Sequence, residues 1–435
     1  MRASTVVLLG LCSSAIVLSL MSTWTTTVET RPRTNVTLKP SAAIPLANRS
    51  IVDCANKRLR AVEGARDIIR DISSRRIVTK LILGHNFLAD EGCVALFDFL
   101  CTPDVKKYKI QEISLNSNGI GDRGLLAIAN YLRENQNLKS LFLQNNAFHG
   151  DPETITIFTE AVNSSCLDTL SLASNTLLSD PFISQFLPTL DARKLRELHL
   201  SMMDMTSLST DPLIHFLSSH RCRLRTLKLN GNNLGTRSVT RIIRAVTMYN
   251  YNMTRLEMSA NYSFDPDENE LDSFAERPAM EKELKRAMDR NEFLARMRQK
   301  DALFLLATSR RLLLRSRRSE SDTATAQPSP NPKAFPFQSL PTELQLHILS
   351  RATPRLSNAQ RLRVFAYAAD PSTLPPSGVS QFTCIPDPGS LPFSTGLGTC
   401  ASGTCLGAGN SLQCRKEKLR NAWLERVDCV LNEPD

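Results

Sequence analysis

The chain has 435 residues, of which 42% are hydrophobic and 22% are charged. This composition is sufficient for a large buried core and excludes a chain that is disordered throughout, and the length suggests about two or three domains. The formal net charge of +10 leaves an acidic partner open, although the basic stretch Ser309–Arg318 is also explained as a solvated helix end.

The first 50 residues form no part of the predicted fold. Residues 1–21 have a basic start and an apolar run from Val6 to Met21, which is typical of a signal peptide but short for a membrane span. A translation start at Met21 is the alternative, and we expect membrane contact only if residues 1–21 are retained as an anchor. Residues 22–50 are rich in Thr, Pro and Asn and are expected to be a disordered arm.

The number of cysteines indicates in which cellular compartment the protein is found. The chain holds eleven of them, an odd number, and we expect Cys93 and Cys166 to behave as small buried apolar residues. Unpaired cysteines are rare in secreted chains. The sequence therefore favours an intracellular protein, cytoplasmic or nuclear, with the secretory pathway as the alternative if residues 1–21 are a true signal.

From Val78 onward the chain is an internal repeat. The pattern LxxLxLxxNxL, with Ile, Val or Met allowed for Leu, starts at positions 78, 110, 138, 167, 195, 224 and 253. Its alternation predicts a short strand, and stripes such as Leu125, Ile128, Ala129 and Leu132 predict a helix after it. A single strand–helix unit cannot bury its own apolar face, so residues 78–264 are predicted to stack as seven repeats with a shared core.

An asparagine occupies the same position in most copies of the repeat. Its side chain carries donors and an acceptor, which suits it to bond the turn that ends each strand. We expect a structural ladder formed by Asn86, Asn118, Asn146, Asn175, Asn232 and Asn261. The fifth copy has Met203 and Met205 instead of the ladder Asn and the following Leu, which we interpret as a tolerated break.

The two ends of the array need caps. Residues 51–77 look like a degenerate half-repeat in which Ile68, Ile69 and Ile72 cover the first coil. Residues 265–318 predict a long helix that caps the last coil. Its predicted apolar stripe comprises Met280, Leu284, Ala287, Met288, Leu294, Met297 and Phe304.

The repeats resemble leucine-rich repeats of the ribonuclease-inhibitor type. The stretches LILGHNFLADEGCVALFDFLC and EISLNSNGIGDRGLLAIANYLREN look like a group of fungal ribonuclease-inhibitor-like proteins, and the resemblance covers roughly residues 51–264. It implies an α/β solenoid, shaped as a horseshoe, with parallel strands on the concave face and helices on the convex face. It identifies a fold better than a function.

The concave face is the predicted recognition surface. Because side chains alternate along a strand, the residue between the two core leucines faces this side. We expect the partner-binding residues to be Ile82, Asn116, Phe142, Gln144, His199, Lys228, Asn230 and Glu257. The alternative is a merely solvated face in which Phe142 packs against Ile82 or a terminal segment.

A polar linker, residues 319–334, leads to a second motif at residues 335–379. The stretch FPFQSLPTELQLHILSRA resembles the opening of an F-box, whose helix docks on the adaptor subunit of cullin-type ubiquitin ligases. The resemblance implies docking through Leu340, Pro341, Leu344 and Ile348. A following helix with Ser357 as its cap is expected, no third helix is found, and a small docking hairpin is the alternative.

The last segment, residues 380–435, is expected to be a cysteine-containing flexible tail. Its cysteines, Cys384, Cys400, Cys405, Cys414 and Cys429, form no CxxC pair, so we expect no metal site. None of the six histidines falls in a catalytic or metal-binding motif. We therefore predict no enzyme, no catalytic residues, no cofactor and no nucleic-acid partner.

The function expected from these features is that of a protein-interaction scaffold. The concave face binds a partner protein, and the F-box-like helix implies the role of a substrate receptor in a cullin-type ubiquitin ligase. The alternative is a relative of the Ran GTPase-activating protein, which also has repeats of the ribonuclease-inhibitor type. That family carries an acidic tail after its repeats, whereas here the short acidic segment Asp265–Glu276 gives way to a basic helix.

Overall fold

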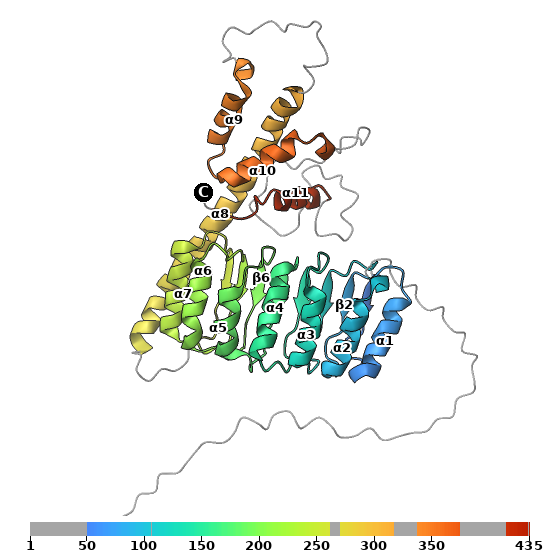
Figure 1. Ribbon diagram of the computed structural model, residues 1–435. Helices are drawn as coiled ribbons and strands as arrows, with labels where there is room; N and C mark the ends of the chain where they lie inside the picture. The colour runs from blue at the N-terminus through green and yellow to red at the C-terminus, as the bar shows by residue number, and fades with distance from the viewer. Residues whose placement is uncertain (1–49, 106, 262–269, 317–336, 375–414, 434) are drawn as a thin grey trace, which may run out of the picture. The chain divides into compact units, whose positions relative to one another are not determined.

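Eight short strands form one parallel sheet in which each strand pairs with its neighbours in chain order. The computed structural model describes residues 50–105, 107–261, 270–316, 337–374, 415–433 and 435 (Figure 1). The strands are β1 (Ile51–Asp53), β2 (Lys80–Ile82), β3 (Glu112–Ser114), β4 (Ser140–Phe142), β5 (Thr169–Ser171), β6 (Glu197–His199), β7 (Thr226–Lys228) and β8 (Arg255–Glu257). The predicted N-terminal segment at residues 1–50, apart from Ser50, and the linker at 319–334 lie outside the described residues.

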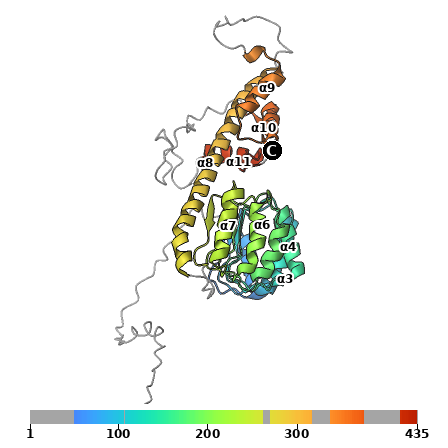
Figure 2. The same cartoon turned by 90° about the vertical axis from the view of Figure 1, so that its left-hand side faces the viewer.

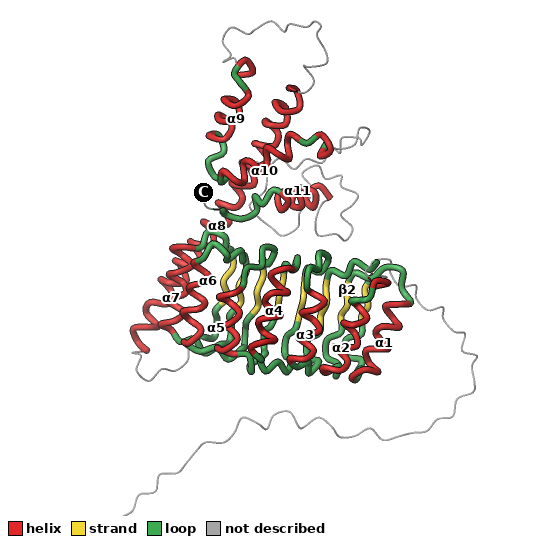
Figure 3. Tube along the Cα trace, viewed as in Figure 1, coloured by secondary structure: helices red, strands yellow, loops and turns green. Residues whose placement is uncertain are grey.

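A helix follows each of the first seven strands. These helices are α1 (Ala61–Ser73), α2 (Ala89–Leu100), α3 (Asp122–Leu132), α4 (Pro152–Ser164), α5 (Ser179–Thr189), α6 (Thr210–Ser218) and α7 (Thr236–Tyr249), with short 3-10 turns at Pro103–Val105 and Ser207–Ser209. They line up along one face of the sheet (Figure 3). The predicted α/β solenoid of alternating strands and helices is therefore confirmed.

The N-terminal cap contains more structure than a half-repeat. Ile51–Asp53 is a strand in register with β2, and α1 follows it, so residues 51–77 add one strand–helix unit to the seven predicted repeats. Ile68 and Ile72 are fully buried, and Ile69 packs at the edge of the core. Only the strand lacks the repeat consensus, which explains why sequence periodicity begins one unit later.

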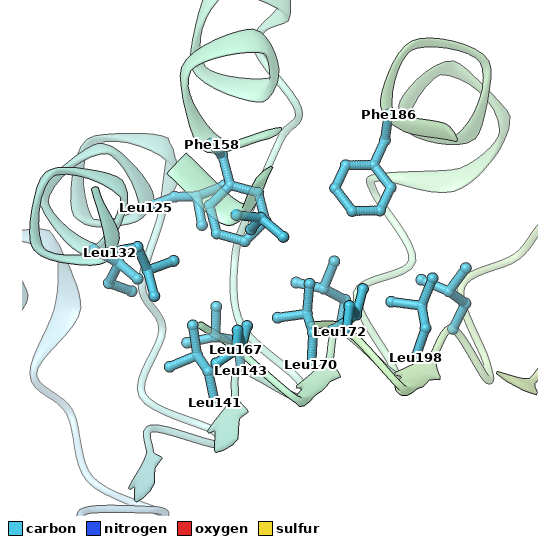
Figure 4. Close-up of a cluster of buried hydrophobic side chains, with 14 of the residues drawn as sticks. Leu125, Leu132, Leu141, Leu143, Phe158, Leu167, Leu170, Leu172, Phe186 and Leu198 are labelled. Carbon is cyan, nitrogen blue, oxygen red and sulfur yellow. The ribbon is translucent and has the colours of Figure 1, made fainter. Parts of the chain in front are cut away.

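The core lies between the sheet and the helices and continues through every coil. Figure 4 shows how it is built: Leu141 and Leu143 from one coil meet Leu170 and Leu172 from the next, below Phe158 of α4 and Phe186 of α5. The two rings stack with their centroids 6.4 Å apart. Burying each of these side chains contributes about 1.5–3 kcal/mol, so the array is stabilised by many equivalent contacts.

The asparagine ladder bonds the turn after each strand. Asn232 represents it: the side-chain amide donates to the carbonyls of Leu229 (2.8 Å) and of Leu200 in the preceding coil (3.0 Å). These bonds bridge a tight turn, because the residue before each ladder position has a positive φ, between 53° and 69°. Those residues are His85, Ser117, Asn145, Ser174, Met202, Gly231 and Ala260. The ladder asparagines are buried, except that Asn146 is partly exposed while making the same bonds.

Two coils depart from the consensus without breaking the core. Met203 and Met205 are fully buried, and their backbone N–H groups still donate to the Oδ1 of Asn232 (2.9 and 3.3 Å). In the fourth coil the turn is one residue longer than the consensus, so that Leu178 is buried while the expected Leu177 is 59% exposed.

A row of aspartates links neighbouring helices, a feature that the sequence analysis did not predict. Asp90 at the start of α2 accepts hydrogen bonds from the backbone of Gly121 (2.7 Å) and Gly124 (2.8 Å), where α3 begins. Asp180 of α5 likewise accepts from the backbone N–H (2.9 Å) and hydroxyl (2.7 Å) of Thr206, ahead of α6. Because the helices are parallel and adjacent, an acidic residue in one first turn caps the next helix.

Glycine is required where these helices approach each other. A Cβ on Gly124 would lie 2.3 Å from the Cγ2 of Ile120 and 2.8 Å from the Oδ1 of Asp90. Any larger residue would therefore displace the capping carboxylate.

Helix α8 (Glu270–Ser316) packs beside α7 and closes the last repeat (Figure 2). Met280, Leu284 and Met288 pack against the core of the array. Asn291 is fully buried and donates to the carbonyls of Asn250 (2.9 Å) and Met253 (2.7 Å). The predicted stripe does not extend to Phe304, which is 48% exposed.

A second core forms along the C-terminal half of α8. We call this part the helical module; it comprises α9 (Thr342–Arg351), α10 (Asn358–Ala369), α11 (Arg415–Arg426) and residues 427–433, with 3-10 turns at Phe337–Ser339 and Pro371–Thr373. Its buried residues are Ala302, Leu305, Leu349, Leu356, Val364, Trp423, Leu424, Val427 and Cys429. The described part of the expected flexible tail is thus a helix and a packed segment, because Trp423, Leu424 and Val427 supply one apolar helix face.

Candidate functional site

Five of the eight predicted concave residues fall into one row across the sheet, and Asn116, Gln144 and Asn230 each lie two residues further along the chain. The third residues of successive strands pair directly, from Ile82 to Ser114 to Phe142 and so on to Glu257. We call this set the concave row: Ile82, Ser114, Phe142, Ser171, His199, Lys228 and Glu257. All of its side chains are partly exposed except Ser171, which is buried.

Phe142 stands in the middle of the concave row. Its direct neighbours are the small residues Ser114 and Ser171, and Ile82 lies one strand further away. Gln144, two residues on, donates from its side-chain amide to the hydroxyl of Ser171 at 2.8 Å. The residues that flank Phe142 in the concave row therefore offer hydroxyl groups, and Gln144 adds an amide.

Two predicted binding residues have a structural role as well. The Oδ1 of Asn116 accepts the backbone N–H of Gln144 at 2.9 Å, and the Oδ1 of Asn230 accepts that of Ser259 at 2.8 Å. Each asparagine therefore ties its own coil to the next. The sequence alone assigned them only to recognition, because a side chain that serves the sheet has the same residue type as one that serves a ligand.

The charged end of the concave row is internally paired. Glu257 accepts from the side-chain amide of Asn230 (2.9 Å) and pairs with Arg255 (2.5 Å). Burial acts to raise the pKa of Glu257, but the Asn230 hydrogen bond and the charges of Arg255 and Lys228 hold it below its usual value. These carboxylate bonds reduce the charge that a partner would meet.

The surroundings of His199 favour its neutral form. Burial, together with the charge of Lys228, lowers the pKa of its imidazole below the usual value. Its Nε2 atom lies 3.7 Å from the Oε2 of Glu197, too long for a hydrogen bond. His199 therefore offers a partner a neutral imidazole.

The F-box-like residues lie on or just before α9. Pro341 occupies the position before the helix, Leu344 is 51% exposed and Ile348 is 41% exposed, while Leu340 is partly buried. The buried face of α9 is formed by other residues, Gln345 and Leu349, and the side chain of Gln345 donates to the carbonyl of Leu340 at 2.8 Å. An apolar pair thus remains on the outer face of the helix.

The next helix begins as predicted at Ser357. Its hydroxyl accepts from the backbone of Gln360, and the Gln360 side chain accepts in return from the backbone of Ser357. Gln360 is fully buried. Its side-chain amide donates to the carbonyls of Asp428 (2.8 Å) and Leu431 (2.9 Å), and these bonds offset the cost of burying it. A third helix, α11, adds Trp423 and Leu424 to the same core as α9 and α10.

The described cysteines are all free thiols. Cys93 is fully buried as expected, whereas Cys166 is partly exposed, with its Sγ 2.8 Å from the Oε1 of Gln136. Within the described ranges no group of His, Cys, Asp and Glu has metal-site geometry, and Cys384, Cys400, Cys405 and Cys414 lie outside these ranges. No helix in the described part of the chain combines the length and apolar character of a membrane span.

Comparisons with known proteins agree with the fold. The family described as Leucine Rich repeat matches residues 109–129. Similar proteins include the Tonsoku-like proteins of Bos taurus (31% identity over 191 residues, 42% of this chain and 14% of the relative) and Mus musculus (29% over 206 residues, 45% and 15%). Another is NACHT, LRR and PYD domains-containing protein 3 of Rattus norvegicus, 28% identical over 164 residues, 38% of this chain and 16% of the relative.

The similarity is confined to part of each protein. The chain spans only 14% to 16% of the length of these relatives. Together with the eight-stranded sheet, the matches establish that the chain contains a leucine-rich repeat array.

Proposed function

We propose that this protein is a non-enzymatic interaction scaffold whose concave row binds a partner protein. The observation that carries the proposal is the register of the sheet, which sets Phe142 among Ser114, Ser171 and Gln144 in a continuous polar strip. A partly exposed aromatic ring surrounded by hydrogen-bonding groups is a favourable anchor for a partner, since such residues dominate binding energy at interfaces. Solenoids commonly use this surface for recognition.

The helical module supplies a second contact in this proposal. The outer face of α9 carries Leu344 and Ile348, both more than 40% exposed, with no described element covering them. Together with Leu340 and Pro341 they keep the F-box-like spacing. We assign this face to docking on a ligase adaptor, so that the repeats act as the substrate receptor of a cullin-type ubiquitin ligase.

Two further assignments accompany the scaffold. The repeats belong to the ribonuclease-inhibitor type, because every coil from β1 to β7 is followed by a helix of 9 to 14 residues. The protein acts inside the cell, in the cytoplasm or nucleus, because its described cysteines are unpaired and several are buried.

The test of the scaffold is affinity purification of the tagged full-length protein with quantitative mass spectrometry. Phe142→Ala should remove the partner of the repeats, and Leu344→Asp with Ile348→Asp should remove only the ligase adaptor. The matched controls are Phe293→Ala, which truncates a 54% exposed ring on α8, and Leu362→Asp with Leu419→Asp, which charge two leucines exposed at 67% and 63%. Both controls should retain all partners.

The outcomes separate the two contacts. If the α9 variant and its control recover the same proteins, the ligase assignment is wrong. If Phe142→Ala loses nothing that Phe293→Ala retains, the concave row does not bind the partner.

The alternative of a Ran-type GTPase activator rests on repeat type alone. A GTP-hydrolysis assay with a panel of small GTPases separates it from the scaffold. Acceleration by the full chain would favour the activator, and the scaffold predicts none.

A further inference from the structure

The edge of the sheet at which the strands begin is rich in cations. The loops that lead from each helix to the next strand hold them. We call these residues the basic edge: Arg76, Lys107, Lys109 and Lys139 before β2 to β4, and Arg196, Arg223 and Arg225 before β6 and β7. They lie apart from the concave row, since each precedes its strand rather than occupying the third strand position.

Helix dipoles do not account for the basic edge. All seven repeat helices point their C-termini toward this edge, and cations in the last helical turn would offset the negative ends of their dipoles. The last turns of α2, α3, α4, α5 and α7 contain no basic residue. The cations stand beyond the helix ends, where the dipole effect has declined.

The opposite edge of the sheet shows the contrast. There the acidic residues do occupy first helical turns, as in Asp90, Asp122 and Asp180, and they cap neighbouring helices. Charge on that edge therefore has a structural purpose within the array. On the basic edge, by contrast, Lys139 and Arg196 donate to loop carbonyls rather than cap helices.

Two cations of the basic edge, Arg196 and Arg223, already lie beside acidic residues of the chain itself. Asp428 pairs with Arg223 at 3.5 Å. Burial lowers the pKa of Arg196, while the charges of Asp168, Asp428 and Glu425 act to raise it, so both C-terminal carboxylates lie near this guanidinium. Asn432 continues the contact by donating from its backbone to the side chain of Asn252 (2.5 Å).

The four cations before β2 to β4 are less covered, although the charge of Lys139 acts to lower the pKa of Asp168 in the next coil. Arg76, Lys107, Lys109 and Lys139 are exposed, and none forms an ion pair with a carboxylate among the described residues. Lys107 lies 5.0 Å from the ring centroid of Tyr108, and Lys139 donates to the carbonyl of Cys166 at 3.3 Å. Two exposed carboxylates, Asp104 and Glu134, lie in the same connecting loops and only partly offset the positive charge.

We propose that Arg76, Lys107, Lys109 and Lys139 bind an acidic segment of a partner protein, as the adjoining cations bind the acidic C-terminal residues of this chain. The occupant is an acidic peptide because, on the same edge, Arg223 pairs with Asp428, and the charges of Asp428 and Glu425 act on Arg196. Its carboxylates would pair with lysines on adjacent coils. This surface is independent of the concave row and of α9.

The test measures binding of a fluorescein-labelled peptide rich in Asp and Glu to the full-length protein by fluorescence anisotropy. The peptide with Asn and Gln in place of the acidic residues, and a single-stranded oligonucleotide of similar charge, are measured beside it. We expect the acidic peptide to bind, its affinity to fall with salt, and Lys107→Glu with Lys109→Glu and Lys139→Glu to weaken it at least tenfold.

The matched control reverses three exposed cations on the repeat helices, Arg66→Glu, Arg123→Glu and Arg244→Glu, and so changes the net charge equally. The control should bind the acidic peptide as the wild type does, and circular dichroism should show the same melting curve for all three proteins. The proposal is overturned if the acidic peptide does not bind. It is also overturned if the oligonucleotide binds more tightly, or if the control loses as much affinity as the edge variant.

Discussion

The repeat array and the helical module are stabilised in different ways. In the array each coil contacts its neighbours at a nearly constant sequence spacing, as when the side chain of Asn232 bonds to the carbonyl of Leu200 in the preceding coil, 32 positions earlier. In the module the contacts join distant parts of the chain, as when the side chain of Gln360 bonds to the carbonyl of Leu431 across 71 positions. The contacts in the array therefore recur with the sequence repeat. The contacts in the module join residues far apart in sequence, and no repeat in the sequence predicts them.

The largest expected effect tests whether the two cores are separate. Leu305→Ala removes a fully buried side chain from the module, and Phe158→Ala removes one from the array. Each should cost about 2–5 kcal/mol of unfolding free energy. Hydrogen exchange read by mass spectrometry should show loss of protection confined to α9, α10 and α11 for Leu305→Ala, and to the repeats for Phe158→Ala. Equal loss in both regions for either variant would mean that the two cores unfold as one unit.

The asparagine ladder provides the next effect. Asn232→Leu leaves two buried carbonyls and two backbone N–H groups of the Met203 turn without the partners they now have. We expect a loss of about 3 kcal/mol in urea denaturation. The matched change Met203→Leu occurs at the natural break in the ladder and should cost less than about 1.5 kcal/mol. Similar losses for the two would show that the amide bonds do not distinguish the positions.

The capping aspartates predict a smaller change. Asp180→Ala removes bonds to the backbone and hydroxyl of Thr206 and should cost about 1–2 kcal/mol. Asp67→Ala is the control, because Asp67 makes only an exposed ion pair with Arg70, with side chains 55% and 78% exposed. Thermal melting compares them, and a control as destabilised as Asp180→Ala would contradict the capping role.

The smallest expected effect is the pH dependence of stability that His199 contributes. The pKa of His199 is lowered in the folded protein by burial and by Lys228, so the unfolded chain binds a proton at higher pH than the folded one. Stability contributed by the neutral imidazole is present above the unfolded pKa of about 6.5 and is lost as the pH falls below it. In urea denaturation, the difference in stability between wild type and His199→Gln should shrink or reverse on acidification from pH 7.5 to 5. An unchanged difference would contradict the lowered pKa.

Most of the array was predictable because the sequence repeat has the same spacing as the strand–helix units. The seven strands from β2 to β8, the helix stripes and the alignment of Phe142 with its neighbours follow from one pattern of leucines and asparagines. What the pattern missed was the eighth unit at Ile51–Asp53, where the strand lacks the consensus, and the lateral caps of Asp90 and Asp180. A cap that acts on the next coil has no local signature within its own helix.

The helical module was less predictable for a physical reason. The third helix of its core, Arg415–Arg426, is separated from α10 by a long segment, and only packing against α8 and α10 gives Trp423 its buried position. Gln345 and Gln360 are polar in the sequence and buried in the fold, because their amides bond to backbone carbonyls. The basic edge was likewise not predicted from the sequence, since its cations are scattered over several loops.

The most direct test of the concave row as the binding surface is site-specific photo-crosslinking in cells. A photoreactive phenylalanine analogue, p-benzoylphenylalanine, is introduced in place of Phe142 in one protein and of Phe293 on α8 in another, and crosslinked products are identified by mass spectrometry. We predict a discrete partner protein crosslinked from position 142 and absent from position 293. The same products from both positions, or none from position 142, would contradict the assignment of the concave row to partner binding.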